Sequence, residues 1–259
     1  MNLEFNITNM VDLKKSYDED GYNHIPELFS ASDMDILNKE FNRYIKDCVP
    51  KMKEQEVYYV DKSNKNTLMQ MQKLEEYDNF FHELFFNSKI KELAANALGE
   101  DVIPRAMEYF NKPPGKNNPT PPHQDGYYFN LDNDKAVTGW LALEDVDDEN
   151  GCIHYVKGSH KKEEYRPHGK SEILGFSQGV TDFGTDEDTK NTVKFEGKAG
   201  MFLMHDAKTI HFASPNKSSV RSRRAFGFVY HGVSAKHDVE KGKAYQKKLH
   251  DELKEKKII

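Results

Sequence analysis

The pattern of hydrophobic and polar positions changes near residue 100 of this 259-residue chain. Before that point the spacing is helical, and it predicts one helix after a cap at 30–33 and a second between Ser88 and Gly99. Their apolar residues recur at steps of three and four: Leu37, Phe41, Tyr44 and Ile45 in the first, and Ile90, Leu93, Ala94, Ala97 and Leu98 in the second. The first 100 residues are therefore expected to be a mainly helical flank.

After residue 100 the pattern predicts about eight short strands separated by turns. The clearest segments are 102–110, 123–131, 136–146, 152–158, 199–206, 208–214 and 223–231. Turns are indicated at Asn150-Gly151 and at Ser214-Pro215-Asn216, and the proline-rich 113–122 excludes a helix or a central strand. We expect one α+β domain with a β-barrel or sandwich core over 101–233 and a charged helical tail over 234–259.

Composition and charge narrow the function. With 37% hydrophobic and 12% aromatic residues, the chain can bury a sizeable core. Its net charge of -6 gives no support for binding to nucleic acid or to an anionic membrane. The two cysteines, Cys48 and Cys152, indicate neither a disulfide framework nor a thiolate zinc site. No segment has the pattern of a signal peptide or a membrane span, so we expect a soluble cytoplasmic protein.

Candidate chemistry begins with the only His-x-Asp among the eleven histidines, formed by His123 and Asp125. On a strand, residues two apart point to the same face, so the two side chains would lie together. A third metal ligand must come from elsewhere, and the candidates are His154, His160, His168, His205, His211 and His231. Two histidines and one carboxylate on one face of a metal leave positions open, as in non-haem iron(II) oxygenases.

The order of motifs resembles the phytanoyl-CoA dioxygenase family of iron(II)- and 2-oxoglutarate-dependent oxygenases. The similarity runs from "NKPPG" through "PPHQDGYYFNL", "VTGWLALEDVDDENGCIHYVKGSHK" and "RPHG" to "KAGMFLMHDAKTIHFASPNKSSVRSRRAFGF", with "YDEDGYNHIPELFSASDMDIL" resembling the family's N-terminal segment. The resemblance implies a double-stranded β-helix barrel (jelly-roll, cupin-like) with flanking N-terminal helices. It also implies iron(II) as the metal and 2-oxoglutarate and O2 as cosubstrates.

The resemblance assigns His123, Asp125 and His211 as catalytic iron ligands, and it implies that Arg223 and Trp140 bind the cosubstrate. Strand parity favours Arg223 modestly, because the small residues Ala225 and Gly227 share its face. Arg223 suits a carboxylate because a guanidinium binds it with two parallel hydrogen bonds. The resemblance also gives His205 a structural role, and Cys152 is interpreted as a small buried hydrophobe. The acidic segment 145–149 is interpreted as a solvated loop rather than a pair of catalytic carboxylates.

Substrate identity is left open by the sequence. Plausible pocket-lining residues are Tyr127, Tyr128, His154 and His168. Five cations in expected loops hint at an anionic substrate, although ordinary surface charge explains them as well: Lys112, Lys116, Lys161, Lys162 and Arg166. The chain departs from the family at Glu108, where an apolar residue of the cosubstrate pocket is expected, and at Ala213, where a hydroxyl residue is expected.

Three functions remain open. The leading hypothesis is a hydroxylase that uses iron(II) and 2-oxoglutarate on a small organic molecule, which could be anionic, and releases succinate and CO2. The alternatives are a non-catalytic cupin-like barrel that binds a metal or small ligand, and a metal-assisted hydrolase with zinc at the same residues. Arg223 argues against the hydrolase, which needs no anchor for a dicarboxylate. The oligomeric state is not indicated.

Overall fold

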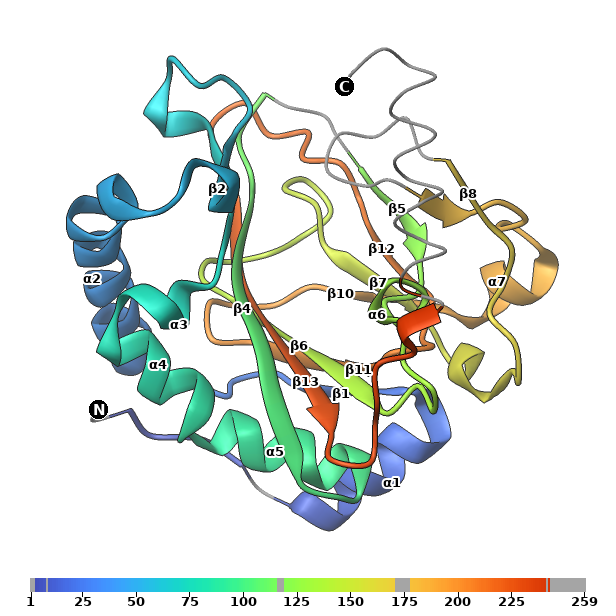
Figure 1. Ribbon diagram of the computed structural model, residues 1–259. Coiled ribbons are helices and arrows are strands. Elements are labelled where there is room, and N and C mark those ends of the chain that lie inside the picture. The colour runs from blue at the N-terminus through green and yellow to red at the C-terminus, as the bar shows by residue number, and fades with distance from the viewer. Residues whose placement is uncertain (1–2, 8, 116–118, 171–177, 241, 243–259) are drawn as a thin grey trace.

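The computed structural model describes residues 3–7, 9–115, 119–170, 178–240 and 242 (Figure 1). The α-helices are α1 (Met10–Asp20), α2 (Ala31–Asp47), α3 (Leu74–Tyr77), α4 (Asn79–Phe86), α5 (Lys89–Leu98), α6 (Gly126–Phe129) and α7 (Asp186–Asn191). Short 3-10 turns cover Val49–Lys51, Glu54–Glu56, Lys65–Thr67 and Ser159–Lys161. None of these helices combines the length and the apolar content needed to span a bilayer.

The strands form three antiparallel sheets. The major sheet has the order β1-β11-β6-β13-β4-β3-β2, with β1 (Tyr22–Ile25), β2 (Val57–Tyr59), β3 (Leu68–Gln72), β4 (Val102–Lys112), β6 (Ala136–Ala142), β11 (Phe202–Asp206) and β13 (Arg223–Gly232). The minor sheet has the order β10-β7-β12-β5, with β5 (Thr120–His123), β7 (Ile153–Val156), β10 (Thr192–Phe195) and β12 (His211–Ala213). A two-stranded sheet pairs β8 (His168–Lys170) with β9 (Gln178–Val180).

Local cap chemistry sets both predicted helices, and both predictions are confirmed. α2 begins at a capping box in which the Ser30 hydroxyl accepts from the Asp33 amide while the Asp33 carboxylate accepts from the Ser30 amide. α5 begins at the Ser88 cap and ends at Gly99, whose φ of 71° lies in the left-handed region that favours glycine.

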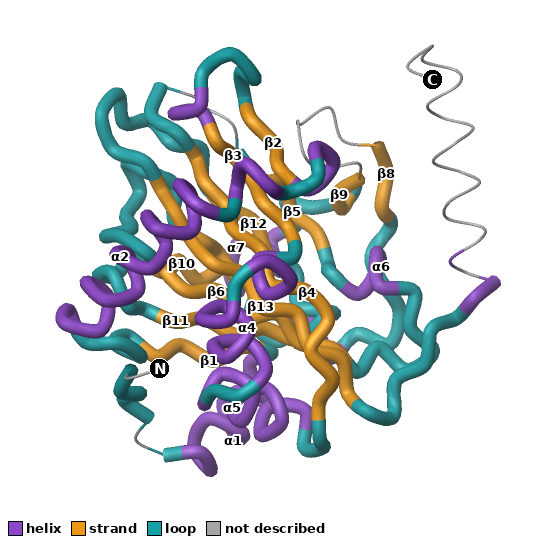
Figure 2. The backbone as a smooth tube through the Cα atoms, turned by 60° about the vertical axis from the view of Figure 1, so that its left-hand side comes forward, coloured by secondary structure: helices purple, strands orange, loops and turns teal. Residues whose placement is uncertain are grey.

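The outer face of the major sheet packs against the helices. Figures 1 and 2 show α2, α4 and α5 along this face of β4 and β13. The ring of Phe226 lies 5.0 Å from that of Phe41 in α2 and 5.5 Å from that of Phe81 in α4. These side chains are fully or almost fully buried. The main hydrophobic core therefore lies between the helices and the sheet, and it leaves the inner face of the sheet available for a site.

Several details of the expected β-region are different in the structure. The strand expected over 123–131 is wrong: β5 ends at His123, and Asp125 has helical backbone angles (φ −59°, ψ −39°) immediately before α6. A local bond from the Tyr128 amide to the Asp125 carbonyl and a long-range bond from the Gly126 amide to the carbonyl of Ala207 stabilise a turn at this point. The chain turns here instead of extending.

The strands on either side of the two expected turns do not pair with each other. β6 and β13 lie in the major sheet, whereas β7 and β12 lie in the minor sheet. The mainly helical flank also supplies β1, β2 and β3, which the sequence pattern did not predict. Among the residues that the structure describes, the strands form separate sheets with free edges and no closed barrel.

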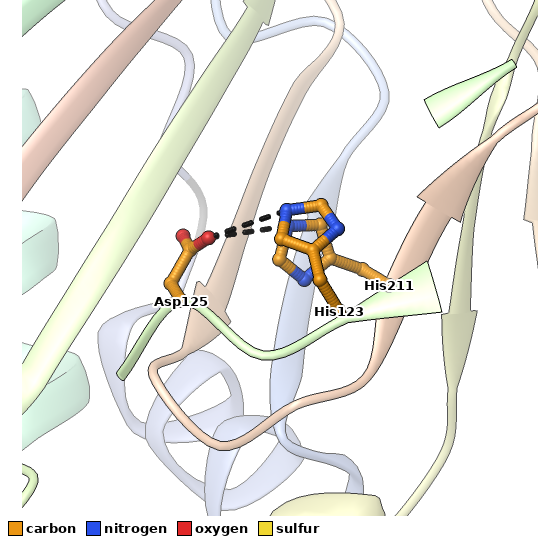
Figure 3. A group of neighbouring side chains, drawn as sticks. All are labelled: His123, Asp125 and His211. Carbon is orange, nitrogen blue, oxygen red and sulfur yellow. Dashed lines mark ion pairs between the residues drawn. The ribbon is translucent and has the colours of Figure 1, made fainter. Parts of the chain in front are cut away.

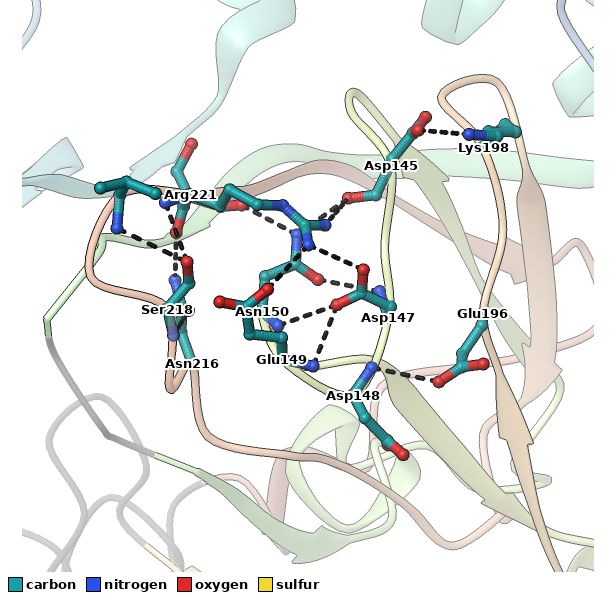
Figure 4. Close-up of polar contacts among 12 residues, drawn as sticks. Asp145, Asp147, Asp148, Glu149, Asn150, Glu196, Lys198, Asn216, Ser218 and Arg221 are labelled. Atoms are coloured by element: carbon teal, nitrogen blue, oxygen red, sulfur yellow. Dashed lines mark hydrogen bonds and ion pairs between the residues drawn. The ribbon is translucent and has the colours of Figure 1, made fainter.

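The acidic segment after β6 is held by cations and backbone amides (Figure 4). The Asp147 carboxylate accepts from the Arg221 guanidinium at 2.8 Å and from the amides of Glu149 and Asn150. Lys198 binds Asp145 at 2.7 Å. These carboxylates thus brace the connection between the two sheets, in agreement with a structural rather than a catalytic role. The tail expected over 234–259 lies mostly outside the described residues.

Candidate active site

A cavity of about 390 Å³ lies against the inner face of the major sheet. Its lining comes from β4, β6, β11 and β13 of that sheet and from β5, β7 and β12 of the minor sheet. Side chains alternate along a strand, so the residues of β13 that face the cavity, Arg223, Gly227 and Val229, alternate with those that pack on the helices. The volume is within the usual range of small-ligand pockets.

The side chains of His123, Asp125 and His211 meet in this cavity (Figure 3). His123 and His211 are register partners on β5 and β12, with ring centroids 4.0 Å apart. Oδ1 of Asp125 lies 3.5 Å from Nε2 of His123 and 3.6 Å from Nε2 of His211. One ligand atom from each residue could therefore contact a single metal ion, and these are the three residues that the family resemblance names.

Backbone contacts orient both imidazoles. Nδ1 of His123 lies 2.8 Å from the carbonyl of Pro121, and Nδ1 of His211 lies 3.0 Å from the carbonyl of Thr209. A carbonyl only accepts, so each Nδ1 carries the proton and each Nε2 presents a lone pair toward Asp125. Burial, with the nearby His123 and His205, lowers the pKa of His211 well below its usual value, which keeps this ring neutral. Neutral imidazoles are the form that binds a metal.

The second oxygen of Asp125 is already occupied. Its Oδ2 accepts from the Thr138 hydroxyl at 2.6 Å and from Nε2 of His205 at 3.2 Å. The Asp125 carboxylate only accepts, so Nε2 of His205 carries a proton, and the Tyr155 hydroxyl lies 2.9 Å from Nδ1 of the same ring. His205 therefore orients the carboxylate and leaves Oδ1 to face the two histidines, which agrees with its expected structural role.

Asp125 is ionised in this setting. Burial by itself would raise its pKa. The interaction with His211, followed by those with His123 and His205, outweighs burial and holds the pKa well below its usual value. Two imidazoles and one monodentate carboxylate are the donor set of non-haem iron(II) sites, so the residues fit the implied metal.

Arg223 brings a buried cation to the same cavity. Only 5% of the residue is exposed, and the guanidinium lies over the ring of Trp140 at 5.5 Å. Its Nε is buried without a hydrogen-bond partner among the described residues, and burial lowers its pKa to about 10. A guanidinium buried this way is expected to bind an anion, because a desolvated charge needs a counter-charge.

Two further residues of the cavity were noted in the sequence but were not assigned to the site. Lys112, expected in a loop, ends β4 directly opposite Arg223 and is only 8% exposed. Burial, and next the charge of Arg223, lowers its pKa to about 6. Glu108 lies on the same face of β4 and lines the cavity. The alternation of Glu108, Phe110 and Lys112 could have shown that the three side chains share one face.

The structure places only one of the four proposed substrate residues in the lining of the cavity. Tyr128 lines the cavity. Tyr127 stacks on His168, with ring centroids 4.0 Å apart. This pair lies beside Tyr128, but neither residue lines the cavity. His154 is not brought to the cavity, because neighbouring residues of a strand face opposite ways and its neighbours Ile153 and Tyr155 point inward.

His154 lies instead near the thiol of Cys152, with Nε2 3.6 Å from Sγ, and the same thiol lies 3.4 Å from the Asp148 carboxylate. Burial raises the pKa of Cys152 to about 12, which agrees with an inert thiol. The cluster nevertheless shows that Cys152 has polar neighbours that are not visible in the sequence.

The five cations that hinted at an anionic substrate do not form a ring. Arg166 is paired with Asp182 and Asp188, and Lys162 lies 3.6 Å from Glu187. Lys161 is exposed, and Lys116 lies outside the described residues. Of the four that the structure describes, only Lys112 lines the cavity.

Comparisons with known proteins agree with this geometry. The family model of phytanoyl-CoA dioxygenase matches residues 17–225. A probable alpha-ketoglutarate-dependent hypophosphite dioxygenase from Stutzerimonas stutzeri is 26% identical over 215 residues, which are 81% of this chain and 74% of that protein. A phytanoyl-CoA dioxygenase from Arabidopsis thaliana is 31% identical over 156 residues. These are 59% of this chain and 53% of the plant protein, so the chain matches about half of that relative's length.

Solved structures show the same fold. The epimerase SnoN, in complex with Fe3+, alpha-ketoglutarate and nogalamycin RO, is 22% identical with a TM-score of 0.70, over 88% of this chain and 85% of that chain. EctD from S. alaskensis, in its apo form, is 18% identical with a TM-score of 0.69, over 89% of this chain and 81% of that chain.

Proposed function

The chain belongs to the phytanoyl-CoA dioxygenase family of iron- and 2-oxoglutarate-dependent dioxygenases, and on that premise we propose that it hydroxylates a small organic molecule. His123, Asp125 and His211 hold the iron(II) in this proposal. Arg223, beside Trp140, holds the far carboxylate of 2-oxoglutarate. The products besides the hydroxylated molecule are succinate and CO2.

One observation carries the proposal. The three candidate ligands and the buried guanidinium of Arg223 line a single cavity. An anion that also reaches the metal satisfies both groups, and a dicarboxylate of the length of 2-oxoglutarate has a charge at each end. A hydrolase has no use for this anchor, so the geometry favours the oxygenase.

The order in which the chain visits the two larger sheets supports a double-stranded β-helix fold. From β4 onward, the strands lie in the major, minor, major, minor, minor, major, minor and major sheets, counting β4 to β7 and then β10 to β13. Successive strands of this series change sheets except between β7 and β10, which is the order expected of a double-stranded β-helix, and we include that fold in the proposal. It brings the end of β5 and the start of β12 together, where the two histidines lie.

The protein's own residues position the reactants. Thr138 and His205 fix the Asp125 carboxylate, and the carbonyls of Pro121 and Thr209 fix the imidazoles, so little reorganisation is needed on metal binding. When bound, the metal supplies oxygen activation coupled to the decarboxylation of 2-oxoglutarate. The carboxylate at Asp125 supports hydroxylation, because related halogenases lack this ligand and use the space for halide.

The proposal is tested by anaerobic titration of the purified apoprotein with iron(II) and 2-oxoglutarate, followed by the visible charge-transfer band of the chelated cosubstrate. We expect the wild type to develop the band and Asp125→Ala to lose it. Arg223→Ala should need about 10 to 100 times more 2-oxoglutarate, because it loses a charge-assisted pair of hydrogen bonds.

Arg224→Ala is the matched control. Arg224 is the next residue of the same strand, faces the other way and binds Glu144 at 3.0 Å, so its removal should leave the 2-oxoglutarate affinity unchanged. Absence of the band in wild type that has bound iron would contradict the 2-oxoglutarate site. Equal weakening by both arginine variants would contradict the assignment to Arg223.

A further inference from the structure

Glu108 places a carboxyl group in the cavity without a cation to balance it. It lies on the inner face of β4, between its register partners Gln72 in β3 and Gly227 in β13. Its side chain bonds that of Gln72. No lysine, arginine or histidine of the described part of the chain forms an ion pair with it. Because Gly227 has no side chain, the residue directly opposite on β13 does not cover the carboxyl group.

Two other buried carboxylates of the described chain are balanced by cations. Asp188 binds the Arg166 guanidinium at 3.0 Å, and Glu56 lies 3.4 Å from Nζ of Lys73. A carboxylate that is removed from water without such a cation is unfavourable. Burial, and next the charge of Asp125, raises the pKa of Glu108 to about 7, which is the sign of that cost. Groups kept in such an unfavourable state are enriched at functional sites.

The cavity also has two ends of opposite charge. Lys112 and Arg223 are register partners at one end of their strands. Glu108 lies four residues along β4 from Lys112, which corresponds to ~13 Å along an extended strand. The dianionic cosubstrate is drawn to the Arg223 guanidinium at this end and repelled by Glu108. The acidic part of the cavity is therefore left for the substrate.

We propose that Glu108 binds a positively charged nitrogen of the substrate, so that the substrate class is small organic amines or amidines. The inference rests on the proposed oxygenase function and narrows its substrate. The cavity lining that includes Glu108 also contains the apolar side chains of Met69, Phe129 and Val229. These walls fit an apolar body attached to the charged nitrogen. An anionic substrate is disfavoured because it would meet the carboxylates of Glu108 and Asp125 together.

The test uses the full chain loaded anaerobically with iron(II) and 2-oxoglutarate. The probes are two matched series: propylamine, 1-propanol and propionate, then benzylamine, benzyl alcohol and benzoate. Calorimetric binding and the shift of the charge-transfer band are measured for wild type, Glu108→Gln and Glu75→Gln. Glu75 is a matched control because it is another buried carboxyl group, carried by α3, that does not line the cavity.

We expect the amine of at least one series to bind wild type and Glu75→Gln at least tenfold more tightly than the alcohol or the acid. Glu108→Gln should reduce this preference to about twofold or less, while the band with 2-oxoglutarate persists. The melting temperature of Glu108→Gln should be unchanged or higher than that of wild type, because the substitution removes a desolvated charge. If the carboxyl group had a purely structural role, the substitution would lower the melting temperature.

The outcomes separate the two proposals. No band in wild type contradicts the oxygenase function and, with it, this inference. A band in wild type without a preference for either amine, or a preference that survives Glu108→Gln, contradicts the role of Glu108 alone. A preference for the acids in wild type also contradicts it, and would indicate an anionic substrate.

Discussion

The two faces of the major sheet are made by alternating residues of the same strands, yet they differ in chemistry and in packing. On the outer face of β4 and β13, Met107, Tyr109, Phe226 and Phe228 are at most 3% exposed and pack on the helices. On the inner face, Glu108 and Arg223 border a cavity next to the residues Gly227 and Val229. The outer face therefore carries apolar side chains whose burial is favourable, and the inner face carries charged side chains whose burial is unfavourable.

The comparison shows that the outer face of the sheet stabilises the fold, whereas the inner face carries the candidate site. Apolar burial on the outer face stabilises the sheet. The inner face holds Arg223 with an unpartnered Nε and Glu108 without a cationic partner, both of which cost stability in the absence of a ligand. A rigid outer layer allows the inner groups to be held in place despite that cost.

The largest expected difference between the faces comes from truncation on β13. Phe226→Ala should lower the free energy of unfolding by about 3–5 kcal/mol, because the ring is fully buried among aromatic neighbours. Val229→Ala, on the inner face and half-buried, should cost about 1 kcal/mol. Urea unfolding of both variants measures the difference, and equal losses would show that the cavity wall is as tightly packed as the core.

A smaller effect is expected from the pH dependence of a carboxyl group near the outer face. Burial raises the pKa of Glu75 to about 7, above its ordinary value of 4.5. Between those two values the folded state keeps a proton that the unfolded state loses, so the contribution of Glu75 to stability falls as pH rises and is constant above about 7. Between pH 4.5 and 8 the wild type should therefore lose about 2 kcal/mol of unfolding free energy through Glu75, after a discount for partial exposure to solvent. Glu75→Gln should not show this loss.

Urea unfolding of wild type and Glu75→Gln at pH 4.5, 5.5, 6.5 and 8 tests this expectation. The side-chain amide introduced by the substitution can still accept a hydrogen bond from the Met107 backbone amide, so the comparison isolates the charge. A constant difference in unfolding free energy across the series would contradict the raised pKa.

The smallest expected difference comes from two glycines, one on each face. A Cβ at Gly139 would lie 2.7 Å from the ring of Phe202, and a Cβ at Gly227 would lie 2.8 Å from the ring of Phe110. Phe202 is fully buried, whereas Phe110 lines the cavity and has space to move. Gly139→Ala should therefore be less stable than Gly227→Ala by about 1 kcal/mol.

Thermal unfolding and binding of the amine probes, applied to both glycine variants, sharpen this contrast. Gly227→Ala should weaken amine binding, because Gly227 lies opposite Glu108 in the part of the cavity left for the substrate, while Gly139→Ala should bind normally. The opposite pattern would contradict the assignment of the two faces.

Features set by neighbours in the chain were predicted well. The caps at Ser30, Ser88 and Gly99 depend on hydrogen bonds within one or two turns, so the sequence was sufficient. The strand expected to carry Asp125 was wrong, because a turn stabilised partly by the carbonyl of Ala207 replaces it. β1, β2 and β3 were missed for a related reason: they are short, and their stability comes from pairing with β11 and β4.

The sequence by itself determined the helix caps, the alternation of β13 and, through the order of its motifs, the likeness to one oxygenase family. Only the tertiary structure decided that His123 and His211, 88 positions apart, are strand partners facing Asp125, and that Lys112 and Glu108 share the cavity with Arg223. The physical reason is the range of the interactions. Caps and side-chain alternation are local, whereas the convergence of ligands and the desolvation of charges depend on how the two sheets pack.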